Sequence, residues 1–130
     1  MTPSWVKEAV FYQIFPDRFR RGDGPTPNPA PVPSGFETWD ALPTLRGFKG
    51  GNLWGVIEKL EYIKEMGFNT LYFCPVFTST ANHRYHTSDY FQVDPILGGN
   101  EALKRVIDEA HAKGLRVILD GVFNHCGRAH

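Results

Sequence analysis

Residues 117–125 read VILDGVFNH, a short apolar run that leads directly into an aspartate, an asparagine and a histidine. Such a run of β-branched and aliphatic residues predicts a strand buried in a sheet. In parallel α/β proteins, ligands and chemistry gather where the strands end. Asp120, Asn124 and His125 therefore form a candidate site. A strand-end aspartate often only caps its loop, but the three polar residues together favour a site.

Two further strands and two helices are predicted upstream of this stretch. Residues 9–14 and 70–74 are short and rich in β-branched and aromatic side chains, which predicts strands. Apolar residues recur at helical spacing over 52–66 and 100–113, which predicts two amphipathic helices. With a last strand at 115–119, strands and helices alternate. This order predicts a parallel α/β sheet with right-handed crossovers.

Asparagine and glycine residues next to the apolar stripes predict where the two helices begin and end. Asn52 and Asn100 precede the apolar stripes and are predicted to be the N-caps. Gly67 and Gly114 follow the stripes, where a left-handed residue commonly ends a helix.

Two long segments separate these elements. Residues 21–36 alternate prolines with small residues, which predicts an extended surface excursion. Residues 76–99 are predicted to be one long loop, too aromatic to be disordered and hence functional.

The amino-acid composition limits the classes of function that the chain can have. The 130 residues carry 14 basic and 14 acidic side chains, so the formal net charge is zero. That balance argues against nucleic-acid or membrane partners. Neither a signal peptide nor an apolar run long enough to span a membrane is recognisable, so a cytoplasmic location is expected. The two cysteines are expected to be reduced, and residues 1–130 are expected to form one domain or part of one.

A second polar cluster spans residues 83–90. His83, His86 and Asp89 are residue types that bind transition metals, so the cluster is a candidate metal site. The same residues with Tyr85 and Tyr90 also suit a sugar-binding rim, in which tyrosine stacks and the polar groups bind hydroxyls. A solvated polar loop without a role is the third interpretation.

Glycine-rich segments offer weaker signals. Residues 22–24 and 50–52 could supply oxygen ligands to calcium, with Asp23 as the carboxylate, although plain turns are favoured. Residues 98–100 open a helix and could bind phosphate, but no nucleotide motif accompanies them and a tight turn explains them better.

Four stretches together resemble one family. Residues 120–125 (DGVFNH) match the first signature segment of the α-amylase family, glycoside hydrolase family thirteen. Residues 10–19, 50–67 and 83–95 resemble the family's first barrel strand, its first helix and the loop leading to the active-site tyrosine. The resemblance runs from about residue 8 to residue 125, and it is nearest to neopullulanases, cyclomaltodextrinases and maltogenic amylases.

The resemblance implies a (β/α)8 barrel with its site at the C-terminal face. Asp120 would then orient the arginine beside the nucleophile, and His125 would bind the 6-hydroxyl of the sugar at the cleavage site. Tyr90 would be the stacking platform under that sugar. Asn124 would brace the loop, or bind calcium in members that depend on it.

Two positions depart from the family pattern. His86, also expected to bind substrate, stands where the family often has aspartate. Asn52 stands where aspartate often follows the two glycines, which weakens a calcium site built on Asp23 and Gly51.

The resemblance also implies what is missing. A retaining glycosidase needs a nucleophile and an acid/base carboxyl about 5 Å apart. In the family these groups follow the fourth and fifth barrel strands, and so lie beyond residue 130. Residues 1–130 are therefore expected to be the N-terminal three-eighths of a barrel, silent alone and prone to self-associate, in an enzyme that acts on α-glucans or maltooligosaccharides. No cofactor is expected apart from possible calcium.

Two other hypotheses remain open. One is a non-catalytic module that binds glucan. The other is a small metal-dependent hydrolase that uses His83, His86, Asp89 and His125.

Overall fold

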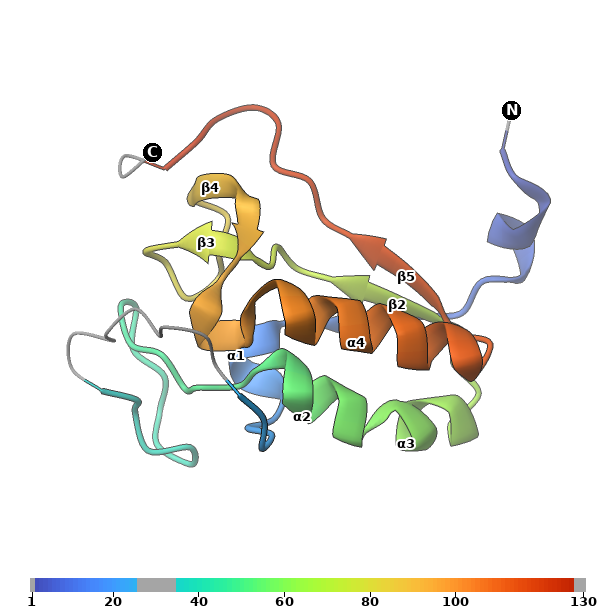
Figure 1. Ribbon diagram of the computed structural model, residues 1–130, viewed down its shortest axis with the longest axis horizontal. Helices are drawn as coiled ribbons and strands as arrows, with labels where there is room; N and C mark the ends of the chain where they lie inside the picture. Colours follow the sequence, from blue (N-terminus) through green and yellow to red (C-terminus); the bar gives the residue numbers. More distant parts are fainter. Residues whose placement is uncertain (1, 26–34, 128–130) are drawn as a thin grey trace.

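Three parallel strands form the centre of the molecule. The structure is a computed structural model that describes residues 2–25 and 35–127. The strands are β1 (Phe11–Ile14), β2 (Thr70–Phe73) and β5 (Arg116–Leu119), in the order β1-β2-β5 (Figure 1). All pair in parallel, which confirms the predicted sheet, although each strand is slightly shorter than predicted. Their carboxyl ends lie level, because Ile14 is opposite Phe73 and Phe73 is opposite Leu119.

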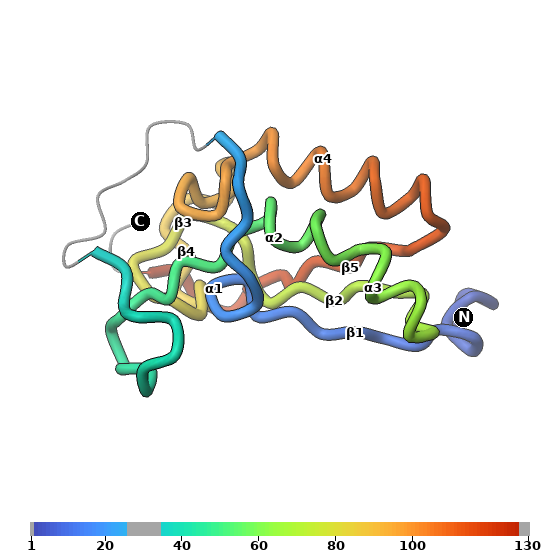
Figure 2. The backbone as a smooth tube through the Cα atoms, turned by 90° about the horizontal axis from the view of Figure 1, so that it is seen from below, coloured from blue at the N-terminus to red at the C-terminus, as the bar shows by residue number. Residues whose placement is uncertain are grey.

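Helices α2 (Leu53–Glu58), α3 (Leu60–Glu65) and α4 (Gly99–Ala112) cover one face of this sheet (Figures 1 and 2). The predicted helix 52–66 is interrupted at Lys59, whose amide bonds to Val56 O, three residues back, in a tightened turn. The apolar stripe nevertheless continues through the interruption. The fully buried core includes Ile14, Leu53, Val56, Leu60, Ile63, Leu71, Phe73, Val106 and Ala110.

The predicted helix ends are correct except at one position. Asn52 Oδ1 accepts from the amide of Gly55, so Asn52 is the N-cap of α2. Gly67 and Gly114 have φ values of +96° and +77°, as residues that end helices often do. The prediction for Asn100 was wrong, because α4 begins one residue earlier and is preceded by a left-handed Gly98. Asn100 Oδ1 instead accepts from Val93 N.

The predicted loop 76–99 contains regular structure. Strands β3 (Phe77–Ser79) and β4 (Thr87–Val93) form an antiparallel hairpin, followed by the short helix η2 (Pro95–Leu97). Arg84, at the turn, is fully buried and has φ +59°. Its Nε lies 2.9 Å from Asp94 Oδ2, and this buried ion pair joins the hairpin turn to η2.

Two short helices were not predicted: η1 (Ser4–Glu8) and α1 (Pro16–Phe19). Of the predicted excursion 21–36, residues 26–34 lie outside the described residues. Its described parts, 21–25 and 35–36, contain neither helix nor strand. Among the residues described, no helix is long and apolar enough to cross a membrane.

Candidate functional site

The site is built on the level carboxyl ends of the three strands. Asp120 directly follows β5, and its amide donates to Phe73 O at the end of β2 (3.0 Å). The amide of Cys74 donates in the same way to Ile14 O, at the end of β1 (2.9 Å). These two bonds continue the hydrogen-bonding pattern of the sheet by one residue beyond the strands. They fix Asp120 at the edge where ligands of parallel sheets bind.

Two tyrosines surround the carboxylate of Asp120. The hydroxyl of Tyr85, from the hairpin turn, donates to Asp120 Oδ2 at 2.7 Å. This hydrogen bond, with burial, raises the pKa of Tyr85 well above its usual range. Burial, followed by the Asp120 charge, also raises the pKa of Tyr72 on β2. Both phenols therefore stay protonated at neutral pH, and Tyr85 serves as a neutral donor to the carboxylate.

The segment after β5 is held down on the hairpin. The hydroxyl of Tyr90 lies 2.7 Å from Val122 O and 2.8 Å from His125 O, so one proton is shared between two carbonyls. The amide of Gly127 donates to Thr87 O at 2.6 Å. A Cβ on Gly127 would lie 2.5 Å from His86 O, so this close approach requires glycine. Tyr90 therefore helps to set the path of the backbone that carries Asn124 and His125.

Three histidines lie side by side at the outer edge of this segment. The rings of His83 and His86 are 5.0 Å apart, and those of His86 and His125 are 6.2 Å apart, both edge to face. His125 Nε2 lies 3.0 Å from Tyr85 O. A carbonyl can only accept, so Nε2 carries the hydrogen and Nδ1 of neutral His125 is an acceptor. Burial, with the nearby charges of His86, Arg84 and Arg18, lowers the pKa of His83.

This cluster does not have the geometry of a metal centre. Within residues 2–25 and 35–127, no group of three or more histidine, cysteine or acidic side chains is placed to hold an ion. His83 Nδ1 instead accepts from the amide of Tyr85 (3.0 Å), and Asp89 Oδ1 accepts from the amide of Phe91 (2.8 Å).

The segments around Asn52 do not fit calcium either. Asn52 Oδ1 already accepts from the amides of Gly22 (3.0 Å) and Gly55 (2.9 Å), while its Nδ2 donates to Gly22 O (3.1 Å). Calcium needs six to eight oxygen ligands. Here the Nδ2–H of Asn52 points at the carbonyl oxygen of Gly22, which a cation would need as a ligand. Asp23 is exposed, and its amide faces Glu58 Oε2 (3.3 Å). The glycines at 22 and 55 allow close backbone packing, because a Cβ on either would overlap the opposite segment.

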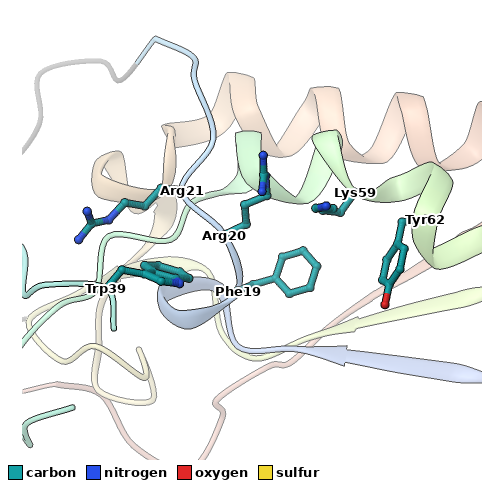
Figure 3. Close-up of a pocket in the computed structure, with 6 residues that line it drawn as sticks. All are labelled: Phe19, Arg20, Arg21, Trp39, Lys59 and Tyr62. Carbon is teal, nitrogen blue, oxygen red and sulfur yellow. The ribbon is translucent and has the colours of Figure 1, made fainter. Parts of the chain in front are cut away.

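Two of the concave surfaces in the described parts of the chain bear on where the site lies. One of about 490 Å³ lies beside α2 and α3 and is lined by three aromatic and three cationic side chains: Phe19, Trp39, Tyr62, Arg20, Arg21 and Lys59 (Figure 3). It contains none of the predicted site residues. The other, of about 980 Å³, is lined on one side by His83 and His86 and therefore adjoins the histidine cluster.

The structure brings most of the predicted site residues together. Asp120, His125, His86 and Tyr90 are linked through the contacts above. Asn124 is exposed on the same segment, and calcium binding there stays a prediction. Asp23 follows α1, on a segment that lies away from the segment after β5 (Figures 1 and 2).

Whereas the family resemblance assigns the stacking role to Tyr90, the sequence interpretation names Tyr85 only as a member of the polar cluster. Its position between two histidines of the polar cluster was visible in the sequence. Its contact with Asp120, 35 residues away, was not.

Both the sequence and the fold of this chain match those of known proteins. Residues 13–130 match the family model for the alpha amylase catalytic domain. Neopullulanase 2 of Thermoactinomyces vulgaris is 49% identical over 128 residues, which cover 97% of this chain and 21% of that protein. The chain thus spans about a fifth of the length of this curated relative.

Two solved structures agree closely in fold. Ttha1563 from Thermus thermophilus has a TM-score of 0.91 and 65% identity, over 97% of this chain and 26% of that one. The ligand-free cyclic α-maltosyl-(1→6)-maltose hydrolase from Arthrobacter globiformis also has a TM-score of 0.91, with 42% identity, over 100% of this chain and 28% of that one.

Proposed function

The chain belongs to the α-amylase family, and from that premise we propose that it supplies the sugar-binding part of a retaining glycoside hydrolase or transglycosylase acting on α-glucans. Its strands and helices form an N-terminal portion of the (β/α)8 barrel. The proposal rests chiefly on one observation, the hydrogen bond from Tyr85 to Asp120 at the carboxyl end of β5.

This arrangement suits a polar, uncharged ligand. Tyr85 occupies one oxygen of Asp120 and holds the carboxylate in place, so the group can accept from a sugar hydroxyl or pair with an arginine. His125 Nδ1 offers an acceptor close by, since Nε2 is used by the Tyr85 carbonyl. The ring of Tyr85 adds an apolar surface beside these polar groups, a combination that is typical of ligand sites.

We assign the bond-breaking carboxyl pair to segments outside residues 1–130. Retaining hydrolysis uses two carboxyl groups about 5 Å apart. The family resemblance places these groups after the fourth and fifth barrel strands, whereas the parallel sheet of the described residues has three strands. Asp120 therefore binds and orients, and the chain alone does not cleave glycosidic bonds.

The test compares variants of the protein expressed from its complete reading frame. We expect release of reducing ends from maltotriose, and Asp120→Asn should lower kcat/KM by about tenfold to a hundredfold, since hydrogen bonds to a charged group contribute about 1.5–3 kcal/mol. Asp108→Asn, an exposed carboxylate on α4, is the matched control and should not change kcat/KM. Equal rates for Asp120→Asn and the wild type would refute the proposed role.

Purified residues 1–130 should release no reducing ends. Hydrolysis by this chain alone would place the catalytic pair within it and overturn the assignment above. Binding of maltose without hydrolysis in the complete protein would instead favour a non-catalytic glucan-binding module.

A further inference from the structure

Arg84, at the turn of the β3–β4 hairpin, has a backbone conformation that residues with a side chain rarely adopt. Its φ of +59° makes it the one residue other than glycine with a positive φ within residues 2–25 and 35–127. Such conformations persist only where the surrounding contacts hold them, and they gather at ligand sites. Deepening the proposed function, on which this inference rests, we propose that Arg84 is a positioning residue that sets Tyr85 against Asp120 and His125.

The side chain of Arg84 holds the turn from within the protein. It is fully buried, and it donates from Nη1 to Asn82 O at 2.8 Å and from Nε to Asp94 Oδ2 at 2.9 Å. The guanidinium also lies over the ring of Phe48, with 5.5 Å between Cζ and the ring centre. Because the guanidinium is planar and its donors have fixed directions, these contacts together define the orientation of the side chain.

The backbone around Arg84 is held as well. The amide of Arg84 donates to Ala81 O (3.1 Å), and its carbonyl accepts from the hydroxyl of Thr87 (3.3 Å). Asp94, the partner of the guanidinium, is anchored at the start of η2, where its Oδ1 accepts from the amide of Ile96 (3.0 Å). The ion pair is therefore fixed at both ends, and the left-handed turn is fixed with it.

Tyr85, the residue after Arg84, uses both of its polar groups at the candidate site. Its hydroxyl donates to Asp120 Oδ2 at 2.7 Å, and its carbonyl accepts from His125 Nε2 at 3.0 Å. The dihedral angles of Arg84 set the direction in which the chain enters Tyr85, so a change at Arg84 would displace both groups at once. Two of the proposed sugar-binding side chains are thus placed through one buried ion pair.

Stability alone does not account for this ion pair. Burial removes both charges from water, and their attraction repays that cost only in part, so apolar side chains of similar volume often stabilise a fold as well. In the described part of the chain, Nη2 of Arg84 is also buried without a hydrogen-bond partner, which adds to the cost. The position of the pair next to Tyr85 is better explained by the conformation that it fixes.

The experiment uses the protein expressed from its complete reading frame and two variants of the pair. Arg84→Lys keeps the charge but loses the fork of donors, whereas Asp94→Asn keeps the shape but loses the charge. In each variant, kcat/KM for maltotriose should fall about tenfold to a hundredfold, because a misplacement of about 1 Å can have an effect of that size. Either variant decides the question if the other does not fold.

Nitrogen NMR of the His125 ring separates positioning from a general loss of stability. In the wild type the ring hydrogen should stay on Nε2, because that atom faces the Tyr85 carbonyl. In both variants the carbonyl is displaced, so the shifts of the two ring nitrogens should become more alike as both tautomers are populated.

Ile63→Ala is the matched control for stability. It removes a fully buried side chain from α3, so it should lower the urea midpoint of unfolding. At a temperature where every variant is folded, its kcat/KM and its His125 shifts should equal those of the wild type.

Two outcomes would overturn the inference. Wild-type kcat/KM together with wild-type His125 shifts in a folded variant of the pair would leave the pair with a structural role alone. Equal effects in Ile63→Ala would mean that any loss of stability disturbs the site.

The proposed function fails in a different way. If the wild type neither binds maltose nor hydrolyses maltotriose, the proposed function falls and the role of Arg84 falls with it. If the wild type is active and the variants of the pair are equally active, only the role of Arg84 falls.

Discussion

The hydroxyls of Tyr85 and Tyr90 donate hydrogen bonds to different kinds of group. Tyr85 donates to the Asp120 carboxylate, whereas Tyr90 lies between the carbonyls of Val122 and His125. The first bond orients the carboxylate that we propose binds the sugar, and the second fixes the backbone path after β5. The family resemblance favours Tyr90 as the platform under the sugar. The contacts give Tyr85 the more direct position beside Asp120, and a role for Tyr90 in stacking stays a prediction.

Removal of each hydroxyl should separate these roles. Tyr90→Phe should speed amide exchange in residues 122–127 about fivefold, because a typical hydrogen bond contributes about 1 kcal/mol. Tyr85→Phe should leave that exchange rate unchanged and weaken maltose binding, because Asp120 loses a donor. The measurements are hydrogen exchange by mass spectrometry and titration with maltose. Fast exchange in Tyr85→Phe but not in Tyr90→Phe would reverse the two assignments.

His83 should titrate below the ordinary value of 6.5 for histidine. Burial is the first cause and the neighbouring His86 the second, so His86→Gln should move the pKa of His83 upward without fully restoring it. Because the pKa is lowered in the folded state, the stability contributed by neutral His83 is present above pH 6.5 and is lost as pH falls through the lowered value. Proton NMR of the imidazole measures this directly. A midpoint at or above 6.5 would contradict the described packing.

At the scale of elements, the side-chain amide of Asn52 joins two parts of the chain. Asn52 caps α2 through Gly55 and bonds in both directions to Gly22. These hydrogen bonds hold the segment after α1 against the start of α2. A carboxylate at this position could accept the same two N–H bonds but could not donate to Gly22 O.

Substitutions at Asn52 should therefore have graded effects on stability. Asn52→Ala removes the cap and both bonds to Gly22, and should cost about 1–2 kcal/mol of unfolding free energy. Asn52→Asp keeps the cap and should cost less in the presence of a chelator, since only the Nδ2 donor is lost. Urea unfolding measures both values. Equal losses in the two variants would mean that the cap contributes nothing beyond the bond to Gly22 O.

The elements that the sequence predicted are those whose signal lies within one segment. The strands at residues 70–74 and 115–119 are short apolar runs, and the stripe through α2 and α3 repeats at helical spacing. Helix α1 has only four residues, too few for a periodic pattern. The β3–β4 hairpin was missed because its strands are largely polar and its turn is held by an ion pair between Arg84 and Asp94.

The same distinction applies to the site. Asp120 and His125 are visible because they follow one apolar run within six residues, although the strand β5 that this run forms is half-buried and not buried as predicted. Tyr85 reaches Asp120 only because the hairpin folds over the strand ends, and no local pattern reports that contact. Asn100 was misplaced because two left-handed glycines, Gly98 and Gly99, let α4 begin earlier than its polar cap candidate.

At the scale of the whole molecule, the sheet has one covered face. The helices lie on one side, where alternate strand residues such as Leu71 and Phe73 are buried (Figures 1 and 2). Of the other alternation, Phe11 is exposed and Tyr72 and Ile118 are half-buried, while Thr70 is buried. Strands β1 and β5 are the outer strands of this sheet, so each has one edge without a neighbouring strand among residues 2–25 and 35–127. The aromatic and cationic hollow beside α2 and α3 adds further surface suited to contact (Figure 3).

This exposed surface predicts that purified residues 1–130 self-associate. In sedimentation velocity, the average mass should rise with concentration, because apolar surface and open strand edges pair with other copies. Phe11→Lys should shift the distribution toward monomer, since Phe11 lies on the outer strand β1 and is 45% exposed. Phe91→Lys is the matched control, because Phe91 is 95% exposed on the hairpin and lies outside this sheet, so its change should leave the distribution as it is. A single monomeric species at every concentration, unfolding in one sharp transition, would mean that the open sheet is stable without a partner.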